Sequence, residues 1–126
     1  MTELLDRAGY RYRRVGGACM CVMEGGLAKW QCAFCQGDSG VLIYSVYPFE
    51  ARGGAALLAR CNSVNALLPD GCFYVEAGRA RVILRSRVDL SDGFYALELF
   101  QRAMELHCSL FLQHWGDIQE AAQGGG

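Results

Sequence analysis

Residues 72 to 90 read CFYVEAGRARVILRSRVDL, and this stretch decides the fold. Apolar and polar residues alternate on both sides of Ala77-Gly78, which is typical of two strands joined by a tight turn. With Ala77-Gly78 as a two-residue turn, Glu76 lies opposite Arg79 as an ion pair on one face. The apolar pairs of the other face are then Phe73 with Val82 and Val75 with Ala80. Because one register satisfies both faces, the stretch predicts an antiparallel hairpin.

The segments around this hairpin predict the remaining elements. Residues 2 to 8 form a short amphipathic helix that ends at Gly9. Strand patterns follow within residues 10 to 23, 29 to 35 and 41 to 47, and helical repeats cover residues 51 to 68 and 93 to beyond 118. Gly25-Gly26 is the expected turn of the first hairpin, and Ser91 or Asp92 the expected cap of the last helix. The predicted order is helix, three strands, helix, two strands, helix, an α+β domain with an antiparallel sheet and helices packed mainly on one face.

Length and composition narrow the class of protein. The chain has 126 residues, of which 52% are apolar and 20% charged, with a formal net charge of −1. This balance argues against intrinsic disorder and against bulk electrostatic attraction to nucleic acid. We expect a single domain over residues 1 to 120 and a flexible tail over 121 to 126. The charged N-terminus lacks the apolar stretch of a signal peptide, and no run is long enough to span a membrane, so we expect a cytoplasmic protein without a membrane partner.

The last predicted helix carries two apolar stripes. The main stripe recurs every three or four residues and comprises Leu97, Phe100, Met104, Cys108, Phe111, Trp115 and Ile118. A second stripe beside it comprises Leu99, Ala103, Leu106 and Leu110. A helix that is apolar around most of its circumference has more surface to bury than one sheet face covers. The second stripe therefore predicts a homodimer contact or a protein-binding surface.

Four segments resemble the YbjN-like family of small bacterial proteins, which are described as sensory transduction regulators. They are LLDRAGYRYRR at residues 4 to 14, CNSVN at 61 to 65 with its Asn62 and Asn65 pair, the hairpin at 72 to 90, and the SDG cap at 91 to 93. The resemblance covers the chain from about Leu4 to Ile118. It implies the fold of the type III secretion chaperones, a regulatory or chaperone-like role, and neither catalytic residues nor a cofactor.

The cysteines allow three interpretations. Zinc needs four ligands that converge on one point, and Cys19, Cys21, Cys32 and Cys35 are the candidates. In a strand, however, Cys32 and Cys35 point to opposite faces. The Gly25-Gly26 turn places Cys19 opposite Cys32 and Cys21 opposite Trp30, so that these three thiols share a face with Phe34. We expect them to pack as small apolar side chains, with a zinc-binding structural or regulatory module as the alternative. A redox dithiol needs a helix N-terminus, whereas this C-x-x-C leads into a glycine turn.

Four arginines line one face of the hairpin's second strand: Arg79, Arg81, Arg85 and Arg87. They predict either a basic strip for an acidic peptide, phosphate or nucleic acid, or a solvated sheet face. On the second interpretation Glu76 pairs with Arg79, and the ring of Tyr74 supports Arg81 through a cation–π contact. Net charge near zero and the lack of an RNA-stacking motif favour the solvated face, with an acidic protein segment as the preferred ligand otherwise.

Asn62 and Asn65 are expected to support the turn after their helix, and His107 and His114 to pack or face solvent.

The leading hypothesis is a non-enzymatic cytosolic protein- or peptide-binding module that forms a homodimer. Its partner surface combines the second stripe with the arginines, and no nucleic acid or cofactor is expected.

Overall fold

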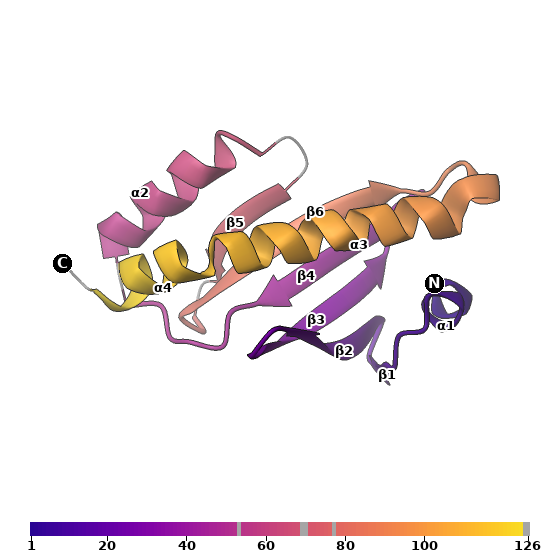
Figure 1. Cartoon of the computed structure of the whole chain (residues 1–126), viewed down its shortest axis with the longest axis horizontal. Coiled ribbons are helices and arrows are strands. Elements are labelled where there is room, and N and C mark those ends of the chain that lie inside the picture. Colours follow the sequence, from indigo (N-terminus) through magenta and orange to yellow (C-terminus); the bar gives the residue numbers. More distant parts are fainter. Residues whose placement is uncertain (53, 69–70, 77, 125–126) are drawn as a thin grey trace.

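The computed structural model describes residues 1–52, 54–68, 71–76 and 78–124 (Figure 1). It confirms the α+β class with an antiparallel sheet, and this sheet has six strands in the order β1-β2-β3-β4-β6-β5. The strands are β1 (Arg13–Val15), β2 (Ala18–Gly25), β3 (Ala28–Gln36), β4 (Gly40–Val46), β5 (Gly71–Glu76) and β6 (Arg81–Asp89). The helices are α1 (Thr2–Ala8), α2 (Gly54–Asn65), the 3-10 turn η1 (Gly93–Tyr95), α3 (Ala96–Gln113) and α4 (Trp115–Gln123).

The predicted element order is wrong in two places. Four strands precede α2 instead of three, because the Gly16-Gly17 turn, with Gly16 at a φ of 60°, separates β1 from β2. The last helix is divided at His114 into α3 and α4. Asp92 is the residue that caps this region, since its carboxylate accepts a hydrogen bond from the Phe94 N–H at 3.1 Å.

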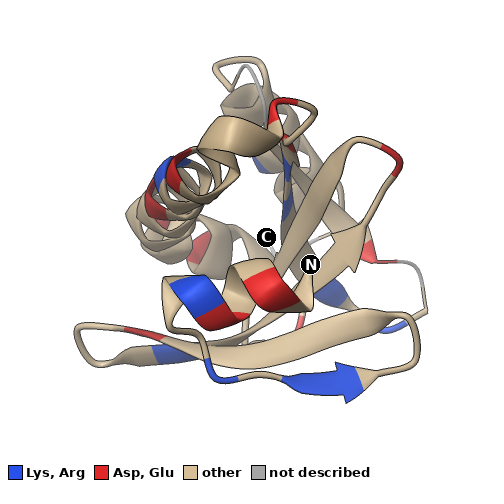
Figure 2. Ribbon diagram, turned by 90° about the vertical axis from the view of Figure 1, so that its right-hand side faces the viewer, with Lys and Arg blue, Asp and Glu red and all other residues tan. Residues whose placement is uncertain are grey.

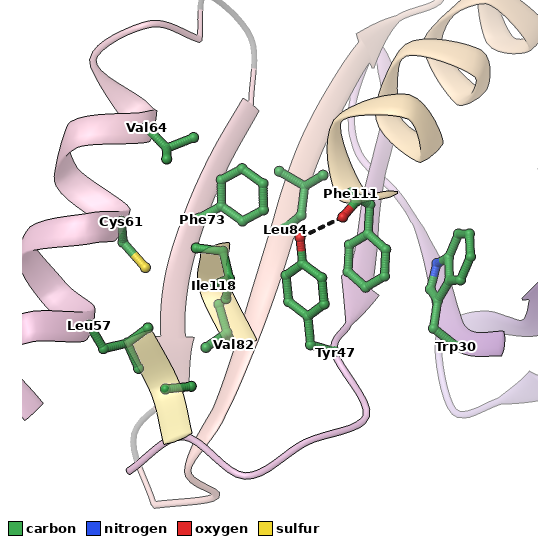
Figure 3. Packing of buried hydrophobic residues seen from close by; sticks show 11 residues of the cluster. Trp30, Tyr47, Leu57, Cys61, Val64, Phe73, Val82, Leu84, Phe111 and Ile118 are labelled. Atoms are coloured by element: carbon green, nitrogen blue, oxygen red, sulfur yellow. Dashed lines mark hydrogen bonds between the residues drawn. The ribbon is translucent and has the colours of Figure 1, made fainter. Parts of the chain in front are cut away.

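Tyr47 stabilises the break between α3 and α4. The last carbonyls of a helix have no partner within the helix. The hydroxyl of Tyr47 donates to one of them, the Phe111 carbonyl, at 2.7 Å, and the two rings stack with centroids 3.9 Å apart (Figure 3). Beyond the break, α4 packs against α2 and continues to Gln123. Residues 121 to 123 are therefore helical, and Ala122 is fully buried, which corrects the predicted start of the tail.

All described helices lie on one face of the sheet (Figure 1), and alternate strand residues form a core beneath them. One cluster joins the sheet to α2, α3 and α4 and includes Trp30, Tyr47, Leu57, Phe73, Phe111 and Ile118 (Figure 3). A second cluster joins it to α1 and α3 and includes Leu5, Cys32, Phe34, Ile43 and Phe100. In the described part of the chain, no helix is long and apolar enough to cross a membrane.

Both hairpin registers differ from the prediction by two residues. Gly25 pairs with Ala28, so that Gly26-Leu27 forms the first turn, and Glu76 pairs with Arg81 instead of Arg79. Of the predicted second turn, Ala77 lies outside the described residues. A shift of two residues keeps every side chain on its face because strand side chains alternate with period two. The predicted inward and outward sets are therefore correct, although their partners are not.

Candidate functional site

A hollow of about 730 Å³ lies on the helix side, between α3, the C-terminal end of α2 and the end of β6. We call it the helix groove, and its apolar walls are Leu67, Leu68, Leu99, Ala103, Leu106 and Leu110. The second stripe of α3 thus forms one wall, as a continuous surface about 16 Å long at 1.5 Å per residue. Leu106 is 54% exposed and Leu67 is 81% exposed, so both walls present apolar surface to solvent.

A chain of hydrogen bonds ties the floor of the helix groove to the sheet. His107 is buried, and its Nδ1 lies 2.6 Å from the Ser86 hydroxyl while its Nε2 lies 2.7 Å from the Ser45 hydroxyl. The indole of Trp30 donates to the same Ser45 oxygen at 3.0 Å. Burial lowers the pKa of His107 to about 4, so the ring is neutral near pH 7. The chain of bonds therefore links α3 to strands β3, β4 and β6.

Of the two alternatives that the sequence left open for His107, packing and exposure to solvent, the structure shows packing, and the two serine partners were not foreseen. A signal was present: His107 falls between Met104 and Phe111 on an apolar stripe, and Ser45 occupies an inward strand position. Polar groups at such positions need hydrogen-bond partners because their burial is otherwise costly. No carboxylate of the described residues hydrogen-bonds to His107, so Ser86 and His107 lack the acidic member of a catalytic triad.

The opposite side of the sheet forms a second surface, which we call the open sheet face. None of the described helices packs against it. One cross-strand row on it runs Arg13, Met20, Ala33, Tyr44, Arg85 and Cys72, and the next runs Val22, Gln31, Val46, Ile83 and Tyr74. The strands contain six Lys or Arg residues and three Asp or Glu residues, whereas the helices contain three and six. Positive charge is thus concentrated on the sheet, as the blue segments on the strands in Figure 2 show.

The arginines of the predicted strip find different partners from those expected. Arg81, not Arg79, pairs with Glu76, at 3.1 Å. Arg85, not Arg81, lies over the Tyr74 ring, 5.9 Å from its centroid. Arg79 lies exposed in the loop before β6, and Arg87 is exposed near the end of the strand.

The structure therefore divides the predicted partner surface between two sides of the sheet. The leucines of the second stripe line the helix groove, while Arg81 and Arg85 occupy the open sheet face. Arg87 is the exception, because it also lines one margin of the helix groove. A single partner segment cannot contact all eight predicted residues at once.

Two shallow hollows lie along the open sheet face and its margin. The first, of about 620 Å³, is lined by Val46, Pro48, Phe49, Arg79 and Arg81 among others. The second, of about 400 Å³, is lined by Arg11, Tyr12, Arg13, Met20 and Cys21. Val22 and Gln31 line both hollows, so the two meet at these residues.

The four candidate zinc ligands do not converge. Cys19, Cys21 and Cys32 are buried under the helices, but Cys35 lies on the opposite face of β3, as its strand position predicts. Cys32 lies opposite Cys21, and Cys19 lies opposite Phe34, which corrects the predicted pairing. The described residues contain no group of three or more His, Cys, Asp or Glu side chains placed to share a metal ion.

The thiols are also poorly placed for redox chemistry. The hydrogen bond between the Cys21 and Cys32 thiols lowers the pKa of Cys21 and, together with burial, raises the pKa of Cys32, and burial raises the pKa of Cys108 to about 11. A nucleophilic thiol needs both a lowered pKa and access to solvent, and Cys21, whose pKa is lowered, is buried. The C-x-x-C segment lies within β3 and not at the start of a helix. Together with their burial, these features match the expected apolar role of the cysteines.

Asn65 supports the strand that follows its helix. Its side-chain amide bonds to the backbone of Phe73 in β5, whereas Asn62 lies exposed on α2. The asparagine pair thus has one member that holds the edge strand and one that faces solvent.

Comparison with protein-family models, curated proteins and solved structures found no match to this chain.

Proposed function

We propose that this chain is a non-enzymatic protein- or peptide-binding module whose helix groove holds an apolar segment of a partner. The observation that supports it best is the pair of leucine walls that line the groove, with Leu106 54% exposed on α3 and Leu67 81% exposed in the turn after α2. A partner that covers this exposed apolar surface is stabilised by about 25 cal/mol per Å² of surface removed from water.

The size of the helix groove favours a segment over a whole domain. Its α3 wall of about 16 Å matches three turns of helix or about five extended residues. Its volume of about 730 Å³ falls within the range of about 300–1,000 Å³ that is typical of small ligand sites. Arg87 and Arg102 lie on its margin with Asp89, so a partner segment with a carboxylate beside its apolar residues fits best.

The hydrogen bonds beneath the groove support a binding role. They fix α3 on the sheet through His107, so the α3 wall is held in place before a ligand arrives. A preformed wall lowers the entropic cost of binding. A regulatory or chaperone-like role, with the architecture of the type III secretion chaperones, is the form of this proposal that the resemblance to the YbjN-like family suggests.

Selection from a random peptide display library, followed by fluorescence polarisation with the enriched peptides, tests the proposal. We expect peptides with two or more large apolar residues at helical spacing, and at least a tenfold loss of affinity in Leu106→Glu. The matched control is Leu58→Glu, because Leu58 is 55% exposed on α2 but does not line the groove. Enrichment of no peptide, or equal affinity in both variants, contradicts the proposal. A dimer in light scattering that Leu106→Glu dissociates would show that a second copy occupies the groove instead.

A further inference from the structure

A continuous trough crosses the open sheet face, on the side of the sheet opposite the helix groove. It arises because the two hollows of this face share Val22 and Gln31. Val22 is 64% exposed. Its neighbours in the cross-strand row are Gln31 of β3 and Val46 of β4, the strands at the middle of the sheet. The centre of the trough is thus an exposed apolar side chain beside the amide of Gln31.

Both ends of the trough are basic. Arg11 and Arg13 line one end, and Arg79 and Arg81 line the other. The carboxylates nearby are largely engaged, since Glu76 pairs with Arg81 at 3.1 Å and Glu50 pairs with Arg52 at 2.9 Å. In the part of the chain that the structure describes, no carboxylate lies within ion-pair distance of Arg11, Arg13 or Arg79. Arginines without a carboxylate partner among the described residues therefore stand at both ends of the trough, Arg11 and Arg13 at one and Arg79 at the other, although the whole chain has a net charge of −1.

The ends of the trough are a defined distance apart. Arg13 and Arg85 share one cross-strand row and are separated by four strand spacings, or about 19 Å along the sheet. Arg81 lies four residues before Arg85 on β6, a further displacement of about 13 Å along the strand. The diagonal from Arg13 to Arg81 is then roughly 23 Å, which corresponds to about seven extended residues.

We propose that the open sheet face binds an extended segment of a partner protein that has apolar residues in its middle and carboxylates about seven residues apart at its ends. The apolar residues cover Val22, and the carboxylates meet the arginines at the two ends. Charge complementarity supports this occupant, because it orients a segment and suppresses partners of the wrong sign.

A second copy of this chain fits the trough poorly. A two-fold contact places the same patch against itself. Because both ends are basic, either orientation brings arginine against arginine, which is unfavourable. An acidic partner avoids this repulsion.

The proposal is tested by fluorescence polarisation with a synthetic 11-residue peptide that has two glutamates at each end and seven alternating valines and serines between them. Comparison peptides replace the glutamates with lysines or shorten the middle to three residues. We expect binding of the first peptide alone, weakened by added salt and at least tenfold weaker in the variant that combines Arg13→Glu and Arg79→Glu. The matched control combines Arg7→Glu with Arg60→Glu, which makes the same charge change at exposed helix positions and should change the affinity less than twofold.

Further measurements distinguish this proposal from binding at the helix groove, binding of nucleic acid and dimer formation. Leu106→Glu should bind the acidic peptide normally, because the helix groove lies on the other side of the sheet. Loss of affinity equal to that of the trough variant would overturn the assignment to the open sheet face. Absence of binding to the acidic peptide, tighter binding of a single-stranded oligonucleotide, or a dimer that the trough variant dissociates would also overturn it.

Discussion

The side chain of Asn65 meets the backbone of Phe73 with both ends of its amide. Nδ2 donates to the Phe73 carbonyl at 2.9 Å, and Oδ1 accepts from the Phe73 N–H at 2.7 Å. Because β5 is an edge strand of the sheet, these two backbone groups point away from β6. The amide thus takes the place that a residue of a neighbouring strand would occupy.

Asn65→Ala removes both hydrogen bonds, and we expect the free energy of unfolding to fall by about 1–3 kcal/mol, since two backbone groups lose partners. Urea denaturation measures this change. Asn65→Asp is the matched control, because its carboxylate still accepts from Phe73 N–H but repels the Phe73 carbonyl. The difference in free energy of unfolding between Asn65→Asp and wild type should shrink as the pH falls and the carboxyl gains a proton. An unchanged midpoint in Asn65→Ala would show that the amide has no role in holding β5.

Tyr47→Phe leaves the Phe111 carbonyl without its buried donor. We expect a loss of about 1–3 kcal/mol in the free energy of unfolding, because an unsatisfied buried carbonyl remains at the end of α3. Tyr44→Phe on the open sheet face is the control and should change stability by less than about 0.5 kcal/mol. Equal losses in the two variants would contradict the assigned role of the Tyr47 hydroxyl.

His107 makes stability depend on pH. Its pKa falls from 6.5 to about 4 in the folded protein because burial disfavours the charged ring. Between these values the unfolded chain binds a proton at this ring and the folded chain does not. The free energy of unfolding therefore falls as the pH falls from about 6.5 to 4, by an amount on the order of 3 kcal/mol, and the full stability is present above pH 6.5.

Denaturation of wild type and His107→Gln between pH 7 and 4 checks this expectation. The variant should be less stable at pH 7 but show a smaller slope in this window. NMR titration of the His107 ring gives an independent measurement that does not depend on the variant's folding. A midpoint near 6.5 would contradict the buried neutral ring.

The cysteines should react slowly with thiol reagents in the native protein. Cys19, Cys21, Cys32 and Cys61 are buried, and Cys35, Cys72 and Cys108 are half-buried. We expect the four buried thiols to be labelled by iodoacetamide only when denaturant is added, as counted by mass spectrometry. Labelling of Cys108 should accelerate toward pH 11, because burial raises its pKa to about that value. A thiol that reacts rapidly at pH 7 would revive the redox interpretation.

Much of the fold was predictable because strand faces are set by alternation alone. Phe73 and Val82 point inward and Arg85 points outward in any register that differs by an even number of residues. The register itself was not predictable, because Gly25-Gly26 and Gly26-Leu27 both satisfy a two-residue turn. The structure uses Gly26 at a φ of 61° in the first central position, which is the position that requires glycine in a type II′ turn.

The division of the last helix and the separation of the two surfaces required the structure. The sequence around His114 contains no proline, and the Tyr47 hydroxyl that donates to the Phe111 carbonyl beside the break belongs to a distant segment. Likewise, the sequence predicts that the second stripe and the arginines are both available to a partner. Only the position of β6 in the sheet shows that they face opposite sides. Long-range relationships of this kind leave no local pattern.

Strand β6 contributes to both surfaces with alternate residues. Ser86 and Val88 belong to the helix groove, whereas Arg85 belongs to the open sheet face. Substitutions at Arg85, or at Ser86 and Val88, can thus alter one surface and leave the other intact, whereas Arg87 and Asp89 at the end of the strand also border the helix groove. Insertion or deletion of one residue within β6 has the opposite effect, since it would exchange the two sets. Natural variation in this strand should therefore consist of substitutions at constant length.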